Sequence, residues 1–320
     1  MSNVRQIILI GVAILNTLTV TACGAISPAA TPTPFLTATP TPSATATPTP
    51  EFEQRPELPP PAMEGDIDVG GKHILSYQCF GDGNPTVIVE AAADDRPTRS
   101  MSWNAVIQGI YPATRICIYD RVPVNTSQDG AENLHILLSK IPLAGPYILV
   151  AHSIGGWYAR VFTHLYPQEV AGMLLVDTTP TYPDSTILLA TAYPTYSADE
   201  AAGIAQNRLP AADINTIIMP QVDGLDMKVS NEQVRQAGSF GNIPLIVICH
   251  TPGPSEMMPG LDPVVQQQIA ALILKVLADQ AALSSKGVFI TAETHHHFIS
   301  LYQPQIIIDA ITRMVNEIRK

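Results

Sequence analysis

The stretch that decides the fold is Tyr147-Ile148-Leu149-Val150-Ala151-His152-Ser153-Ile154-Gly155-Gly156. Its apolar first half predicts a buried strand, and residues 157–166 directly after it predict a helix. Ser153 lies in the turn between them among small residues, which leave room for a strained backbone that exposes one hydroxyl. The pattern approximates G-x-S-x-G, with Ala151 in the first glycine position and Gly155 in the second. We interpret Ser153 as a nucleophile; the alternative is an ordinary turn in which its hydroxyl caps the helix.

Apolar runs alternate with helical segments on both sides of this stretch. Short strands are predicted at residues 66–69, 73–80, 86–91, 114–119, 147–151, 171–176, 243–249 and 288–291. Helices are predicted near Trp103–Tyr111 and from Pro304 to Ile318. Buried strands separated by helices predict a mostly parallel sheet covered on both faces. The interval from Asp177 to Asn242 holds helical pieces and no strand pattern, which predicts a small cap at about 178–242.

The N-terminus predicts export. Arg5 precedes an apolar stretch from Ile7 to Val20, which is too short to span a membrane. Small residues then precede Cys23, in an arrangement that resembles a bacterial lipobox. We therefore expect a lipoprotein signal peptide over 1–22 and lipidation of Cys23, which anchors the protein to the extracytoplasmic face of a membrane. The alternative is a plain secretory signal cleaved nearby.

Residues 23–62 are rich in Thr, Pro and Ala, with repeated Thr-Pro pairs. Such a composition cannot build a core and predicts a disordered, semi-rigid linker. The remaining residues, 63–320, suit one α/β domain.

Composition narrows the partners and the redox chemistry. The hydrophobic fraction of 46% is ample for a core, and the net charge of -11 argues against a nucleic-acid ligand. Cys79 and Cys117 lie in two predicted strands, and both a disulfide between them and two free thiols are compatible with export. Cys249 lies in an apolar run and is expected as a buried thiol.

Five motifs give the chain a resemblance to a known superfamily. They are Pro85–Ala91, Tyr119-Asp120-Arg121, Ala151–Gly156, Leu174–Asp177, and His297-Phe298-Ile299 followed by Gln303-Pro304. Through them residues 65–320 resemble the α/β-hydrolase superfamily, and most closely bacterial esterase-like members with a short cap. The resemblance implies an eight-stranded, mostly parallel α/β-hydrolase sheet with helices on both faces. It also implies a Ser-acid-His triad in that chain order, with no metal and no organic cofactor.

The general base is expected in the loop before the last helix. A serine hydroxyl becomes an effective nucleophile only when an imidazole takes its proton. Three histidines, 295–297, follow the last predicted strand, and alignment with the superfamily selects His297. A histidine tract can instead bind a metal or be exposed without a role. His152 is expected to be a packing residue and His250 a strand-end residue.

The triad acid must accept a hydrogen bond from the far nitrogen of the imidazole. Asp177 ends a predicted strand at the correct edge of the sheet and is the first candidate. Glu256 and Asp262, after the next strand, stay open as alternatives.

The oxyanion hole needs two backbone N–H groups. Ile154, directly after the nucleophile, and Ala93, in the turn after the third strand, are the expected donors. The chain departs from the superfamily here, because glycines are expected where Ala92 and Asp94 stand. Alanine narrows the allowed backbone conformations, which puts the efficiency of the site in question.

Together these residues predict a serine hydrolase that cleaves small carboxylic esters through an acyl-enzyme. A peptidase or thioesterase differs only in substrate, and a haloalkane dehalogenase would need a carboxylate in place of Ser153. The alternative from another class is an inactive envelope lipoprotein of the same fold that binds a ligand or a partner protein.

Overall fold

The computed structural model describes residues 56–181, 223–251, 264, 271 and 274–320. The predicted signal peptide, Cys23, most of the linker and most of the cap lie outside the described residues, and these stay predictions. Among the described residues, none of the helices combines the length and the apolar character needed to cross a bilayer.

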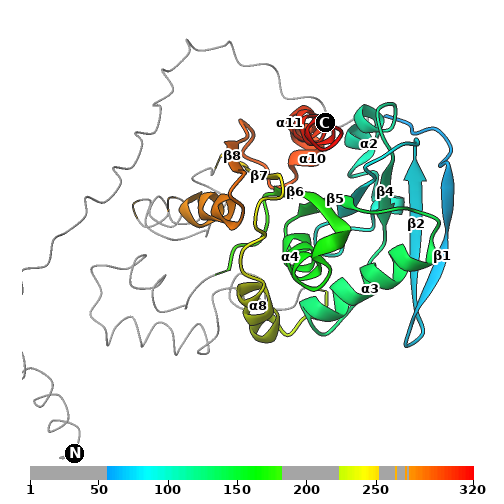
Figure 1. Ribbon diagram of the computed structural model, residues 1–320, viewed down its shortest axis with the longest axis horizontal. Helices are drawn as coiled ribbons and strands as arrows, with labels where there is room; N and C mark the ends of the chain where they lie inside the picture. The colour runs from blue at the N-terminus through cyan, green and yellow to red at the C-terminus, as the bar shows by residue number, and fades with distance from the viewer. Residues whose placement is uncertain (1–55, 182–222, 252–263, 265–270, 272–273) are drawn as a thin grey trace, which may run out of the picture. The chain divides into compact units, whose positions relative to one another are not determined.

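One eight-stranded sheet forms the centre of the described domain (Figure 1). Its strands in chain order are β1 (Met63–Gly70), β2 (His73–Phe80), β3 (Val87–Glu90), β4 (Ile116–Tyr119), β5 (Tyr147–His152), β6 (Val170–Val176), β7 (Leu245–Cys249) and β8 (Gly287–Thr291). Their order across the sheet is β1-β2-β4-β3-β5-β6-β7-β8. β1 and β2 pair antiparallel to their neighbours, and all pairs from β4 to β8 are parallel. The predicted mostly parallel sheet is confirmed.

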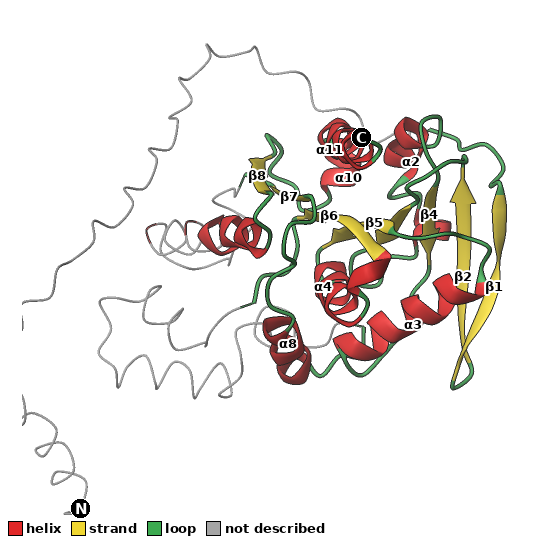
Figure 2. Ribbon diagram, in the orientation of Figure 1, coloured by secondary structure: helices red, strands yellow, loops and turns green. Residues whose placement is uncertain are grey.

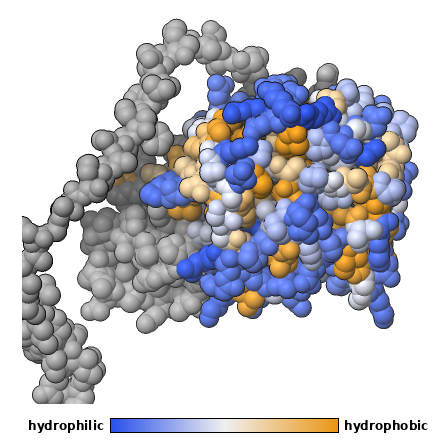
Figure 3. Space-filling model, in the orientation of Figure 1, coloured by the Kyte–Doolittle hydropathy of each residue, from blue (hydrophilic) through white to orange (hydrophobic). Residues whose placement is uncertain are grey.

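Helices cover both faces of this sheet (Figure 2). The helices α3 (Ser127–Lys140), α4 (Gly155–Leu165) and α8 (Met227–Gln236) lie together on one face. The helices α2 (Asn104–Ile110), α10 (Ile299–Tyr302) and α11 (Pro304–Ile318) lie on the other. A short helix, α1 (Pro97–Ser100), follows β3. The visible surface is mostly hydrophilic over the helices, with smaller hydrophobic areas between them (Figure 3).

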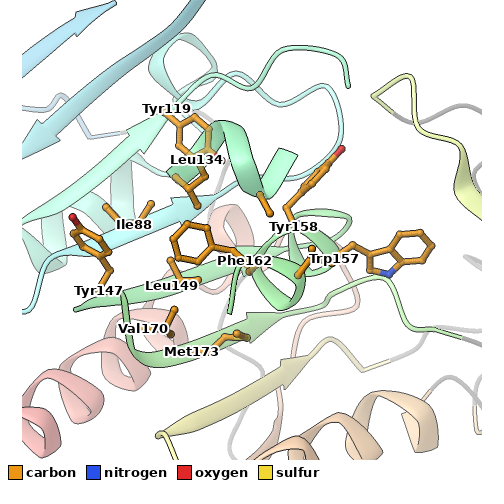
Figure 4. Packing of buried hydrophobic residues seen from close by; sticks show 14 of the residues in the cluster. Ile88, Tyr119, Leu134, Tyr147, Leu149, Trp157, Tyr158, Phe162, Val170 and Met173 are labelled. Atoms are coloured by element: carbon orange, nitrogen blue, oxygen red, sulfur yellow. The ribbon is translucent and has the colours of Figure 1, made fainter. Parts of the chain in front are cut away.

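The two faces of the sheet pack into two apolar clusters, because buried parallel strands present apolar side chains on both sides. On the α3 and α4 face, Phe162 lies beside Leu134 and Leu149 (Figure 4). On the other face, α2 and α11 bury Trp103 and Ile311 against the strands. β5 is buried along its whole length, so the turn that follows it starts from a fixed strand.

A disulfide joins Cys79 in β2 to Cys117 in β4. It closes a loop over a sequence separation of 38 residues. Cys249 is a buried free thiol, and burial raises its pKa.

Removal of this disulfide is expected to destabilise the domain. In the chain-entropy model a loop of this length contributes about 4 kcal/mol to the free energy of unfolding. A Cys79→Ser, Cys117→Ser double variant should therefore lose stability of this order in urea denaturation. The Cys249→Ser variant is the control, because Cys249 takes no part in the crosslink. Equal stability of the double variant and the wild type would contradict the prediction.

Candidate active site

Ser153 lies at the sharp turn between β5 and α4. Its φ is +55°, in the left-handed region that L residues adopt at a cost, and its exposed fraction is only 4%. Gly155 explains how the turn fits: a Cβ there would lie 2.2 Å from the carbonyl oxygen of Glu90 and 2.6 Å from that of Ala91. The turn therefore packs directly on the end of β3, and only glycine is tolerated at this position.

Asp177 follows β6, the neighbour of β5 in the sheet. Its φ is also positive, at +47°, and its N–H donates to the carbonyl of Ile248 in β7 over 2.6 Å. The N–H of Ser153 donates to the carbonyl of Val176 over 3.3 Å. Ser153 and Asp177 thus lie at adjacent ends of parallel strands, as the sequence pattern predicts.

His297 comes from the loop between β8 and α10, and its side chain lies at the carboxyl ends of the strands, beside Asp177. Its Nδ1 lies 2.5 Å from Oδ2 of Asp177. Its ring centroid lies 4.7 Å from that of His152, the residue before Ser153. The side chain of His297 is 44% exposed, whereas that of Asp177 is 3% exposed. The carboxylate therefore holds one nitrogen of an imidazole that remains accessible from outside.

His250 is the residue of this site that the sequence analysis missed. Its Nδ1 lies 2.6 Å from Oδ2 of Asp177, and its backbone N–H donates to Oδ1 over 3.3 Å. We expected only a strand-end residue, and it does follow β7 directly. Its place at the carboxyl end of a strand beside β6 was the signal that could have indicated this contact.

The surroundings keep Asp177 ionised. Burial raises its pKa, but the hydrogen bonds and charges of His250 and His297 more than offset burial and hold the pKa well below its usual range. Asp177 is therefore a carboxylate at any pH near neutrality, and it favours the tautomers of both histidines that carry a proton on Nδ1.

The same three residues could also be considered as ligands of a metal ion. Asp177, His250 and His297 offer ligand atoms that all lie within 4.8 Å of one another. However, both Nδ1 atoms lie at hydrogen-bond distance from one carboxylate oxygen, closer than the ~3.3 Å between ligand atoms around a tetrahedral zinc. We describe the group as a shared hydrogen-bonded set.

The other histidines support the loop. His152 is 1% exposed, and its Nε2 lies 2.9 Å from the carbonyl oxygen of His297. Since a carbonyl only accepts, Nε2 carries the proton. His295 Nδ1 bonds the carbonyl of Thr251 over 2.7 Å, and His296 stacks on Tyr302. These contacts fix the loop that carries His297.

His152 should make folding stability depend on pH. Burial, together with the charge of His297, lowers the pKa of His152 to about 3. Between pH 6.5 and 3 the unfolded chain therefore binds a proton that the folded protein does not, and stability falls as the pH falls, by up to about 1.4 kcal/mol per pH unit. A His152→Gln variant should show a shallower slope when unfolding is measured from pH 7 to 4. Parallel slopes would contradict this assignment.

The two expected oxyanion donors come from two different segments of the chain, the start of α4 and the turn after β3. Ile154 is the first residue before α4, and its N–H is one of the amides at a helix start that have no acceptor within the helix. Ala93 is half-buried in the turn after β3. Asp94, where a glycine was expected, has a φ of +52°. The turn therefore adopts a conformation typical of glycine without having one.

The alternative acids, Glu256 and Asp262, lie outside the described residues. The same holds for residues 182–222 of the predicted cap.

Known proteins resemble this chain in fold more than in sequence. No family model matches the chain. A probable transporter from Hormonema carpetanum is 28% identical over 138 residues, which cover 38% of this chain and 19% of the relative. An uncharacterized protein of Schizosaccharomyces pombe is 36% identical over 83 residues, covering 23% of this chain and 16% of the relative. The chain thus spans less than a quarter of these relatives.

Solved structures match most of the chain. An esterase from Thermogutta terrifontis covers 81% of this chain over its full length, with 17% identity and a TM-score of 0.51. A haloalkane dehalogenase loop variant from Bradyrhizobium elkanii gives a TM-score of 0.55 at 14% identity, covering 80% of this chain and 97% of its own. An α/β hydrolase fold protein from Burkholderia ambifaria gives 0.50 at 14% identity, covering 78% of this chain and 100% of its own.

These likenesses, together with the order of the strands, define the fold. The protein has the α/β-hydrolase fold.

Proposed function

We propose that this protein is a serine hydrolase that cleaves small carboxylic esters, with Ser153 as nucleophile, His297 as base and Asp177 as acid. The observation that carries the proposal is the contact of 2.5 Å between His297 and Asp177 at the edge where Ser153 forms its strained turn. A buried carboxylate and an accessible imidazole beside such a turn are the parts that acyl transfer requires.

In the proposed reaction, Ser153 Oγ attacks the ester carbonyl while Nε2 of His297 takes the hydroxyl proton. Asp177 holds Nδ1 and stabilises the imidazolium that forms. The N–H groups of Ile154 and Ala93 stabilise the oxyanion. His297 then protonates the departing alcohol, and water repeats the two steps to release the acid and free Ser153.

An ester is favoured over the other bonds that this fold can cleave. Dehalogenation needs a carboxylate nucleophile, and the residue at the turn is a serine. An alkoxide leaves more readily than an amine anion, so a site without further acid catalysis favours esters over amides. The similarity to a haloalkane dehalogenase thus concerns the fold alone.

A substrate panel tests this proposal. The purified chain should hydrolyse p-nitrophenyl acetate and butyrate. It should cleave the matching thioester and anilide more slowly, and it should release no halide from 1-bromobutane. Hydrolysis of none of these esters would support the inactive binding protein instead. If the thioester or the anilide were cleaved faster, Ser153 would remain the proposed nucleophile, but the proposed substrate class would change.

A further inference from the structure

The turn after β3 holds its glycine-like conformation without glycine. Asp94 has a φ of +52° and is exposed, so packing does not impose this conformation. Aspartate adopts this region more readily than most L residues but less readily than glycine, so a hydrogen bond to Asp94 helps to hold the conformation. The expected donor Ala93 directly precedes Asp94, so whatever holds Asp94 also orients that donor.

Arg121 lies two residues after the end of β4, and its side chain binds the first half of this turn. One guanidinium nitrogen donates to the carbonyl of Ala91 over 2.6 Å and to the carboxylate of Glu90 over 2.9 Å. The other donates to the carbonyl of Ala92 over 2.6 Å. The side chain of Arg121 is 8% exposed and that of Glu90 is fully buried. These bonds fix the end of β3 against which Ser153's turn packs.

Asp223 holds the second half. Its Oδ1 accepts the N–H of Asp94 over 3.1 Å, and its Oδ2 lies 2.7 Å and 3.2 Å from two nitrogens of Arg121. The hydroxyl of Tyr158 in α4 donates to the same oxygen over 3.3 Å. One carboxylate therefore bonds the strained residue, the arginine that holds the rest of the turn, and the helix that follows Ser153.

The cluster joins one guanidinium to two carboxylates. Burial lowers the pKa of Arg121, but Glu90 and Asp223 more than offset burial, so the guanidinium stays charged. Its ring neighbour Tyr158 lies 4.8 Å below the guanidinium carbon. Loss of Asp223 would leave a buried cation with one carboxylate partner and Asp94 without its acceptor, which weakens both halves of the turn.

The position of Asp223 in the chain connects this cluster to the predicted cap region. Asp223 lies within the predicted cap region, and its carbonyl accepts the N–H of Val124 over 3.0 Å. One side chain of the predicted cap region thus binds the turn that follows Ala93.

We propose that Asp223, acting through Arg121 and Asp94, is a positioning residue for the oxyanion turn and replaces the conformational freedom that glycines would give it. This inference rests on the proposed ester hydrolysis. It assigns to a residue of the predicted cap region a role in transition-state stabilisation, separate from any role in holding substrate.

The test uses the full chain with Asp223→Ala, the milder Asp223→Asn, and Asp226→Asn as a matched control. Asp226 lies three residues after Asp223, and its carboxylate caps α8 by accepting the N–H of Val229. We expect kcat on p-nitrophenyl butyrate to fall about 10- to 100-fold in Asp223→Ala, since a displaced oxyanion donor costs that much or more. KM should stay within about twofold, and Asp226→Asn should behave as wild type.

Two further readouts separate positioning from a merely structural role. Affinity for butylboronic acid, which forms a tetrahedral anion on the nucleophile, should fall in proportion to kcat/KM. Adding Asp94→Gly to Asp223→Ala should restore part of kcat, because glycine adopts a positive φ without the hydrogen bond. If the alanine variant does not fold, Asp223→Asn replaces it in both measurements, with a smaller expected loss of kcat.

The outcomes are distinguishable. Unchanged kcat and boronate affinity in the Asp223 variants, with an active wild type, would overturn the inference alone. A loss of kcat without weaker boronate binding and without rescue by glycine would show a structural role and would overturn it as well. A wild-type protein that hydrolyses no ester would overturn the proposed function.

Discussion

Replacement of Ser153 by alanine is expected to reduce ester hydrolysis by about 10⁴-fold or more, because every step of the proposed reaction passes through its hydroxyl. The variant should fold, since alanine fills the same small, buried place at the turn. Initial rates on p-nitrophenyl butyrate, with thermal unfolding recorded beside them, check both expectations.

Ser300→Ala is the matched control for this variant. Ser300 is a buried serine in α10, three residues after His297, and its hydroxyl has no hydrogen-bond partner among the described residues. Its loss should leave the rate within about twofold. An active Ser153→Ala variant, or an equally inactive Ser300→Ala variant, would contradict the assignment of the nucleophile.

Replacement of Asp177 by asparagine is expected to lower kcat by about 10⁴-fold with little effect on KM. Asparagine cannot stabilise the imidazolium of His297, and its amide favours the wrong tautomer of the ring. The change also removes the charge that two histidines share. Steady-state kinetics at pH 7 to 8 measures the effect, and circular dichroism establishes whether the variant is folded.

Glu256→Gln and Asp262→Asn are the comparison, because both residues were open as acids in the sequence. We expect each to retain kcat within about threefold. If Asp177→Asn remained active and one of the other two variants lost its activity, the triad acid would be the residue after β7. Asp177 would then only order its loop.

The sequence predicted the sheet well, because each strand from β3 to β7 is mostly apolar and almost wholly buried. The helix from Pro304 to Ile318 was also predicted with its bounds, since proline at its start and amphipathic spacing both indicate it. Strand boundaries shifted by one or two residues for β3 and β4, and β1 begins three residues before its predicted start.

The electrostatic partners could not be predicted from the pattern. His250 meets Asp177 across 73 residues, and Arg121 meets Asp223 across 102, so neither contact leaves a local signal. The sequence places Arg121 in the motif Tyr119-Asp120-Arg121 and gives it no role of its own. The sequence itself shows that Ala92 and Asp94 stand where glycines are expected. Only the fold shows that the carboxylate of Asp223 binds the backbone of Asp94 and so holds the turn.

The most direct measurement is the site of covalent labelling by a fluorophosphonate. Phosphonylation requires an activated hydroxyl, a nearby base and an accessible oxyanion hole, which are the parts joined here at Ser153, His297 and Ile154. Tandem mass spectrometry of the labelled, digested protein should find one adduct, on the peptide that contains Ser153. No adduct, or an adduct on another serine, would contradict the proposed active site.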